Sequence, residues 1–296
     1  MDNKTQLNQA IKYMLVASFF FALTGAFAKI LSSDISSVEV VFFRNVFGLI
    51  IILYAIYKTP IIQKGGKPIL LLARGLVGFL ALLMYFYDIA YIPLAQAQTF
   101  TKTSPIFTAI FSYLILNEKL TLRQSFGIVL GFIGILFITG FDIATISKTD
   151  WLGILSGIGA GLAYTSIREL KKFYDTKIIV LSFMGVGTFG PLIIMVLANY
   201  YSSDTFDFIL APFTIPKVEN WIYIVGLGLS ATVSQINMTK AYSLAKGGIV
   251  GTIGYTNIIF SIFLGVFLGD LFPSLNILTG IGLIILSGIL VSYTKK

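Results

Sequence analysis

The stretch LAQAQTFTKTSPIFTAIFSYLILNE, residues 94–118, decides how the rest of the chain is interpreted. It is long enough to cross a bilayer as a helix, because about 20 residues, each rising about 1.5 Å, span the hydrocarbon core. Yet Lys102 and Pro105 stand near its middle, where an ionisable group costs at least about 2.5 kcal/mol and a proline removes a helix hydrogen bond. Both residues are therefore expected to face protein or a water-filled cavity, and the stretch predicts one wall of a polar pathway.

The composition is that of a polytopic membrane protein. Of the 296 residues, 56% are hydrophobic and 11% are charged, and the mean hydropathy is +0.90. Soluble domains, in contrast, carry about 25% charged residues. The chain has no Cys and no His, which removes disulfides, thiol chemistry and imidazole metal ligands. We therefore expect neither a cofactor nor a bound metal ion.

Apolar segments bounded by charged, Gly, Pro or Ser residues recur along the whole chain. The ten predicted spans are residues 11–31, 38–57, 69–90, 94–116, 122–140, 151–170, 178–200, 219–241, 247–269 and 275–293. The first follows Lys4 and Lys12 and ends in an A-x-A pattern at residues 26–28, as a signal peptide would, but nine more spans follow and we expect it to be retained. The connection at 202–219 is the only long one and predicts an ordered external loop.

The distribution of Lys and Arg predicts the orientation in the membrane. If the N-terminus is cytoplasmic, most of these residues, Arg74 among them, fall on the inner side and only Lys29, Lys148 and Lys217 on the outer side. Cytoplasmic loops carry this excess of positive charge, so we predict a multi-pass protein of the cell (inner) membrane with both termini cytoplasmic. The net charge of +8 then reflects topology and contact with membrane lipid, and we expect no nucleic-acid partner.

A weak internal repeat divides the chain into halves. Residues 75–91, GLVGFLALLMYFYDIAY, align without a gap on residues 226–242, GLGLSATVSQINMTKAY, and a shift of one more residue sets Pro105 opposite Asn257. Five spans per half is an odd number, so the halves must be inverted relative to each other. We predict an all-α integral membrane protein of ten transmembrane helices, built as two inverted five-helix repeats, residues 1–145 and 146–296, around a central cavity.

A set of short motifs follows in order along the chain: FR at 43–44, AYIPLA at 90–95, Pro105, LNEKLT at 116–121 and GxxxGxxG at 127–134. Together they resemble the EamA-type ten-span family of the drug/metabolite transporter superfamily. The resemblance covers about residues 13–293 and implies an exporter or exchanger of small metabolites, related to sugar-phosphate and nucleotide-sugar carriers. The chain departs from the family pattern at three positions: Asn257 stands at the proline position, Asp270 replaces Glu, and Lys102 is not expected. The resemblance is therefore not used to assign a substrate.

Glycines spaced four apart predict helix faces that a neighbouring backbone approaches closely. The two clearest sets are Gly127 with Gly131, and Gly153 with Gly157 and Gly161. The glycines of residues 247–254 are less regular and either only pack or also loosen the helix backbone. Close packing of this kind also gives surfaces that can rock against each other in a transporter.

Two cations lie deep in the predicted spans. Arg44 and Lys102 are each about 10 to 12 Å below the external surface, and no acidic residue lies comparably deep. This predicts either an anionic group on the ligand or a lysine that loses its proton when desolvated. Arg44 could instead be structural, by snorkelling or by pairing with Glu39. Gln98, Lys102 and Pro105 share one helix face, so we expect Lys102 to line the cavity and Pro105 to kink the helix.

Further substrate-binding candidates come from the third, eighth and ninth spans. Tyr85, Gln235 and Asn237 belong to polar strips of the third and eighth spans. Tyr255 and Asn257 correspond in the repeat to the segment around Lys102, and an amide can both donate and accept. Such side chains could also only bond across helices, which is worth about 0.6 kcal/mol on average in membranes.

These features predict a secondary transporter of small organic metabolites that works by alternating access, as a monomer or homodimer in membrane lipid. Its substrate is expected to carry a carboxylate or phosphate, as an amino acid does. The alternative is a proton-coupled exporter of cationic drugs or toxic compounds, which would need a deep Asp or Glu. An enzyme is disfavoured because clustered carboxylates and phosphate-binding Gly motifs are missing as well as His and Cys. Glu118 and Asp270, at span ends, are predicted to be gate or structural residues.

Overall fold

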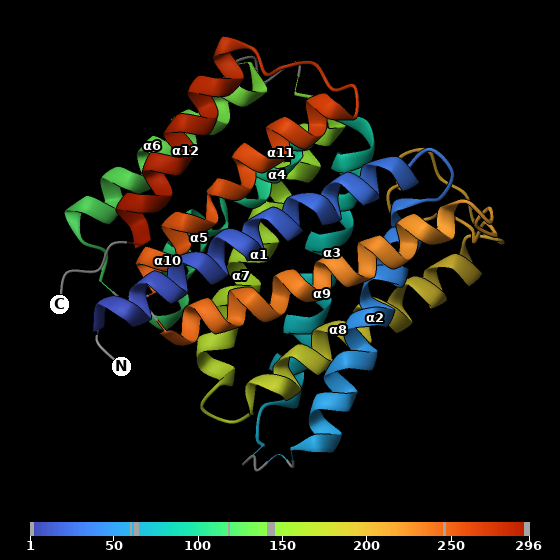
Figure 1. Cartoon of the computed structure of the whole chain (residues 1–296), viewed down its shortest axis with the longest axis horizontal. Helices are drawn as coiled ribbons and strands as arrows, with labels where there is room; N and C mark the ends of the chain where they lie inside the picture. Colours follow the sequence, from blue (N-terminus) through green and yellow to red (C-terminus); the bar gives the residue numbers. More distant parts are fainter. Residues whose placement is uncertain are drawn as a thin grey trace.

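The structure, a computed structural model, describes residues 3–59, 61, 65–117, 119–140, 146–244 and 247–292, and every regular element in this part of the chain is an α-helix (Figure 1). The helices are α1 (Asn3–Leu31), α2 (Ser37–Lys58), α3 (Pro68–Tyr91), α4 (Leu94–Thr101), α5 (Ser104–Leu116), α6 (Leu122–Thr139), α7 (Lys148–Leu170), α8 (Thr176–Leu197), α9 (Asn220–Leu244), α10 (Gly247–Gly254), α11 (Thr256–Phe267) and α12 (Leu275–Ser292).

Seven helical segments of the described residues are long and apolar enough to cross a membrane. They are α1, α2, α3, α6, α8, α12 and the joined segment Val250–Phe267 of α10 and α11. The all-helical fold and the multi-pass character predicted from the sequence are thereby confirmed. The number of ten spans stays a prediction, because α4 and α5 are each short and α7 and α9 fall outside this set of seven.

Residues 94–116, predicted as one span, form two helices with a break at Lys102 and Thr103. Pro105 has no N–H to donate to the carbonyl of Thr101, so the regular ladder cannot continue through this turn. The N–H of Lys102 is shared between the carbonyls of Gln98 and Thr99, at 3.2 and 3.1 Å, and the N–H of Thr103 bonds the carbonyl of Phe100, three residues back, at 3.1 Å. Pro105 itself occupies the first turn of α5, where a missing N–H costs little. The helix is thus interrupted for two residues next to the predicted kink, while the backbone of Lys102 and Thr103 stays in the right-handed helical region.

The predicted span at residues 247–269 is broken as well, although it contains no proline. α10 ends at Gly254, α11 begins at Thr256, and Tyr255 lies between them. The N–H of Tyr255 bonds the carbonyl of Thr252, three residues back, at 3.2 Å. Each glycine in a helix interior costs about 1 kcal/mol relative to alanine. The position of the break therefore agrees with the role of these glycines in loosening the backbone.

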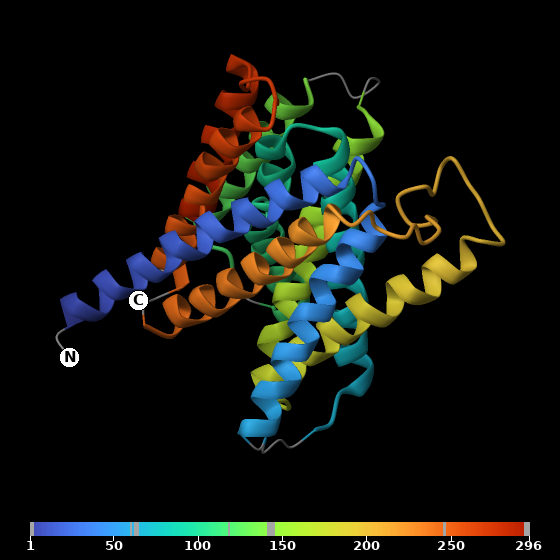
Figure 2. The ribbon, with the colours of Figure 1, turned by 45° about the vertical axis from the view of Figure 1, so that its right-hand side comes forward.

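The helices pack in pairs that join distant parts of the sequence. α1 runs along α9, α3 along α7, α2 against α8 and α6 against α12 (Figures 1 and 2). The beginning of α1 and the end of α12 lie at the same end of the bundle. We name this the short-loop end, since it also carries the connection at 171–175, and we name the opposite end, with residues 32–36 and 198–219, the long-loop end.

The glycine faces predicted from the sequence are confirmed. A Cβ atom on Gly127 would lie 3.2 Å from the backbone oxygen of Ser287 in α12, so α6 and α12 approach almost backbone to backbone. On α7, a Cβ atom on Gly157 would overlap Thr103, at the break between α4 and α5. Small residues therefore hold α7 tightly against the broken helix.

The long connection between α8 and α9 is folded onto the long-loop end, as its prediction as an ordered loop requires. The N–H of Thr214 donates to Glu39 at 3.0 Å, and the hydroxyl of Tyr87 donates to Asp207 at 2.9 Å. Lys217 forms an ion pair with Asp34 at 2.5 Å, in the turn between α1 and α2. These bonds tie the loop to α2, α3 and the α1–α2 turn.

Candidate functional site

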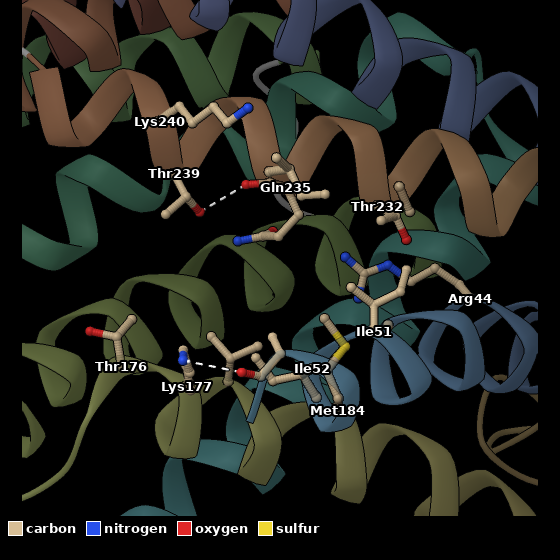
Figure 3. Close-up of a pocket in the computed structure, with 15 residues that line it drawn as sticks. Arg44, Ile51, Ile52, Thr176, Lys177, Met184, Thr232, Gln235, Thr239 and Lys240 are labelled. Atoms are coloured by element: carbon tan, nitrogen blue, oxygen red, sulfur yellow. Dashed lines mark hydrogen bonds between the residues drawn. The ribbon is translucent and has the colours of Figure 1, made fainter. Parts of the chain in front are cut away.

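A cavity of about 320 Å³ lies between α2, α8 and α9 (Figure 3). Its volume falls in the range of small-molecule sites, roughly 300 to 1,000 Å³. Aliphatic side chains form most of the wall, and Arg44 and Gln235 are among its polar groups. The cavity extends to the short-loop end, where Lys177 and Lys240 border it. A polar solute could therefore enter from that end and reach Arg44.

Arg44 contributes the deepest charge of this cavity and is only 8% exposed. Its Nη1 donates to Oδ1 of Asn45 at 3.1 Å, and its Cζ lies 5.7 Å from the centre of the Phe183 ring. The pairing with Glu39 considered from the sequence does not form, because that carboxylate caps α2 through Ser36. Among the described residues no carboxylate forms an ion pair with Arg44.

Arg74 is a second buried cation, although the distribution of Lys and Arg predicts it on the cytoplasmic side. It lies in α3, is 8% exposed, and places its Cζ 4.7 Å from the centre of the same Phe183 ring. Its Nε and Nη1 atoms are buried and have no hydrogen-bond partner in the described part of the chain. A signal for its burial was present, since Arg74 falls inside the predicted span 69–90.

Lys102 and Gln98 both face α1, as their spacing of four predicts. The Lys102 Nζ lies 5.9 Å from the centre of the Phe21 ring, and no ion pair to it is found within the described residues. Gln98 is buried with its Nε2 unbonded, beside Gly25, one turn further along α1. The structure therefore brings an amide and an ammonium to one face of the broken helix.

Tyr85 links the Arg44 region to Gln98. A Cβ atom on Gly25 would lie 3.0 Å from Nε2 of Gln98 and 3.5 Å from the hydroxyl of Tyr85. The same tyrosine lies within electrostatic range of Arg44. Gly25 thus leaves room for two polar groups, from α3 and α4, to meet beside α1.

The remaining substrate-binding candidates lie apart from one another. The hydroxyl of Tyr255 donates to the carbonyl of Lys102 at 3.4 Å, so the two helix breaks touch. Nδ2 of Asn257 donates to the carbonyl of Ser18 at 3.0 Å, and Nδ2 of Asn237 donates within α9 at 2.8 Å. Gln235 lines the cavity with Arg44. Glu118 lies outside the described residues.

Asp270 joins three segments at the long-loop end. Its carboxylate forms an ion pair with Lys29 at 2.7 Å and accepts the N–H of Leu94, also at 2.7 Å. Lys29 in turn donates to the carbonyl of Ile92 at 2.8 Å. We call this set of bonds the latch. It ties the end of α1 to the α3–α4 and α11–α12 connections at the long-loop end.

Asp88 is a buried carboxylate near the long-loop end of α3. It is fully buried, and neither of its carboxylate oxygens has a hydrogen-bond partner in the residues that the structure describes. It packs beside Gly153 of α7, which also contacts the ring of Phe100. Burying a carboxylate without hydrogen-bond partners is costly.

The chain matches known proteins over nearly its whole length. Residues 8–140 match the EamA-like transporter family. A protein of Helicobacter pylori described as an uncharacterized transporter is 31% identical over 287 residues, with 95% of this chain and 94% of the relative covered. This chain belongs to the EamA-like transporter family. It is therefore a multi-pass membrane protein of a family of small-molecule transporters, and the resemblance to drug/metabolite transporters is confirmed.

Two further relatives carry more specific descriptions. The pseudopaline exporter CntI of Pseudomonas aeruginosa is 31% identical over 293 residues, and 98% of each chain is covered. An S-adenosylmethionine uptake transporter of Rickettsia prowazekii is 24% identical over 299 residues, with 99% of this chain and 95% of the relative covered. These relatives are transporters and not enzymes, and they differ in solute and in direction.

A solved protein structure shares the fold. It superposes with a TM-score of 0.59 over 98% of both chains, at 16% sequence identity. At that identity the similarity extends to the fold alone.

Proposed function

We propose that this protein is a secondary transporter, an exporter or exchanger, that moves a small organic metabolite with a carboxylate or phosphate group across the cell membrane. The observation that carries the proposal is Arg44, a buried cation that lines a cavity of about 320 Å³ and has no ion-pair partner among the described residues. A buried charge without a partner is costly, so an anionic solute would stabilise it. An amino acid is the simplest solute of this kind.

Alternating access between two inverted five-helix repeats, residues 1–145 and 146–296, is the mechanism we propose. The packing supports this mechanism. If the helices of the two halves correspond in order, α1 to α7, α2 to α8, α3 to α9 and α6 to α12, then the packed pair α1–α9 is equivalent to the packed pair α7–α3, and the pairs α2–α8 and α6–α12 are each equivalent to themselves. Each half also contributes one broken helix, the usual device for building a site near the middle of the membrane.

The structure corresponds to one state of that cycle. The latch of Lys29 and Asp270 closes the long-loop end, and the cavity extends to the short-loop end. With both termini cytoplasmic in the inner membrane, as we propose, this is the inward-facing state of a monomer or homodimer. Opening outward would require the latch to break, which gives Asp270 the role of a gate.

Within the pathway, we assign Arg44 and Gln235 to the cavity reached first by a solute from the short-loop end. Gln98, Lys102 and Tyr85 would be met further along, where the helix breaks lie, and Tyr255 supports Lys102 through its carbonyl. Asn237 and Asn257 donate to backbone carbonyls in this state, and their part in binding would require a rearrangement.

A second candidate function, proton-coupled export of cationic compounds, is favoured by Asp88. A buried carboxylate without partners is what an exchanger of protons against cations needs. Asp88 lies near the long-loop end, away from the cavity with Arg44, and for this reason we rank this function second.

The test is uptake into liposomes that contain the purified protein, with labelled glutamate, succinate, glycerol 3-phosphate and tetraphenylphosphonium, against protein-free liposomes. We expect saturable uptake of at least one of the three anions. Saturable uptake of tetraphenylphosphonium alone would replace this function with the second candidate. Asp88→Asn separates the two, because it should abolish coupled cation export and leave anion exchange intact.

A further inference from the structure

Two arginines from different helices share one aromatic ring. Arg44 of α2 and Arg74 of α3 both direct their guanidinium groups to Phe183 of α8, at 5.7 and 4.7 Å from Cζ to the ring centre. Val180 and Met184, which flank Phe183 on α8, line the cavity described above. Both guanidinium groups therefore lie at one ring, next to the cavity that Arg44 lines.

Nothing in the described protein neutralises this pair. No ion pair reaches either arginine from a described carboxylate. Nε and Nη1 of Arg74 lack acceptors although the side chain is more than nine-tenths buried. Burying a guanidinium group without a charged partner is costly, and contact with a ring face offsets only part of that cost.

Unbonded guanidinium donors in a buried site match the chemistry of an oxyanion. Arginine presents planar N–H donors that fit carboxylate and phosphate geometry, and charge-assisted bonds of this kind are the strong ones. We propose that Arg44 and Arg74, which both lie against the Phe183 ring, together form the anion subsite of the pathway and bind the carboxylate or phosphate group of the transported solute. This rests on the proposed function and adds to it Arg74 and the ring.

The test is the concentration dependence of uptake by the full chain in liposomes, with labelled glutamate, succinate and glycerol 3-phosphate as probes. Arg74→Gln removes the charge and should raise the KM for the transported probe by roughly tenfold to a hundredfold, the worth of a hydrogen bond to a charged group. Arg44→Gln should do the same, and the double variant should add little, because the two arginines bind one group.

Arg123→Gln is the matched control, since Arg123 is an exposed arginine at the start of α6, and it should keep the wild-type KM. If Arg74→Gln does not reconstitute, Arg74→Lys keeps the charge but not the planar donors, and a raised KM is again expected. A wild-type KM in the Arg74 variants, with uptake by the wild type, overturns this inference and leaves the proposed function standing. If the wild-type protein takes up none of the three probes, both fail.

Discussion

The two broken helices of the molecule, α4–α5 and α10–α11, share their architecture but differ in chemistry. Each consists of an eight-residue helix, a break, and a second helix of 13 or 12 residues. The first break carries Lys102, with the unbonded Gln98 one turn before it. The second carries Tyr255, which donates to the carbonyl of Lys102 at 3.4 Å. The first break thus provides a charged side chain, and the second provides a neutral hydroxyl that bonds the backbone of the charged residue.

The same difference separates α2 from α8. Arg44 follows the start of α2 by as many residues as Phe183 follows the start of α8, since the helices begin at Ser37 and Thr176. A cation on one helix thus faces an aromatic ring at the corresponding position of the other. The first half thus supplies the cations that lie within the bundle, and the second half supplies neutral groups that contact them. The two lysines that the second half adds to the cavity, Lys177 and Lys240, border it at the short-loop end.

The strongest way to break this division is to place a charge in the second half. Phe183→Arg would bury a third guanidinium beside Arg44 and Arg74, and we expect it to destabilise the protein by about 3 to 5 kcal/mol. Phe183→Leu keeps an apolar side chain and should cost about 1 to 2 kcal/mol. The measurement is thermal unfolding in detergent, and equal midpoints for the two variants would contradict the division.

The tightness of the two breaks should differ as well. Gly157→Ala forces a methyl group against Thr103 and 2.8 Å from the carbonyl oxygen of Phe100, so we expect a cost of about 1 to 3 kcal/mol. Gly254→Ala at the second break meets only the flexible end of Met14, at 2.8 Å, and should cost less than about 1 kcal/mol. Thermal unfolding of both variants, compared with Gly282→Ala in open space, checks the order.

The latch predicts a smaller, conformational effect. Lys29→Ala breaks the ion pair with Asp270, which is partly buried, and should shift the population toward the outward-open state by roughly fivefold. The chain has no native Cys, so Ala95→Cys reports this opening through labelling by a membrane-impermeant maleimide from the outside. Lys148→Ala at the same end is the control. Equal labelling rates in both backgrounds would remove Asp270 from the gate.

The smallest effect belongs to the loop on the long-loop end. The Lys217 ammonium lowers the pKa of Asp34, and Asp34 raises the pKa of Lys217. Because the carboxyl pKa is lowered, the ion pair stabilises the docked loop fully above about pH 4, and this stabilisation is lost as the pH falls through the lowered pKa of Asp34. Because the lysine pKa is raised, the stabilisation is also lost at high pH, but only above about pH 10. Hydrogen exchange at Asn220 should therefore be slow at pH 7. Asp34→Asn should speed it slightly at pH 7, and this difference from the wild type should shrink as the pH falls below about 4.

The helices themselves were largely predictable from the sequence, because long apolar runs and their punctuation identify membrane spans. The first break could be foreseen in part, since Pro105 signals the lost hydrogen bond. The second could not be placed, because no proline marks it and glycines permit a break without fixing its position. The packing faces of α6 and α7 followed directly from the spacing of their glycines.

The site residues were predictable only where the sequence pattern of a single helix, such as the spacing of its polar residues, identifies them. Gln98 and Lys102 face α1 as their spacing requires, and Arg44 stood out because it interrupts an apolar span. Arg74 was missed because a segment with three lysines, Lys58, Lys64 and Lys67, precedes it, and this suggested a surface position. Its ring partner Phe183 follows from tertiary packing between α3 and α8, which no local pattern encodes.

The central claim, that the first half binds an anionic solute through its cations, is tested most directly by double-label uptake into liposomes. Labelled glutamate and labelled tetraphenylphosphonium are offered together to the wild type, Lys102→Ala and Tyr255→Phe. We predict saturable glutamate uptake by the wild type. Uptake should fall at least tenfold in Lys102→Ala, which corresponds to about 1.4 kcal/mol, and only a few-fold in Tyr255→Phe. Undiminished glutamate uptake by Lys102→Ala would contradict the account.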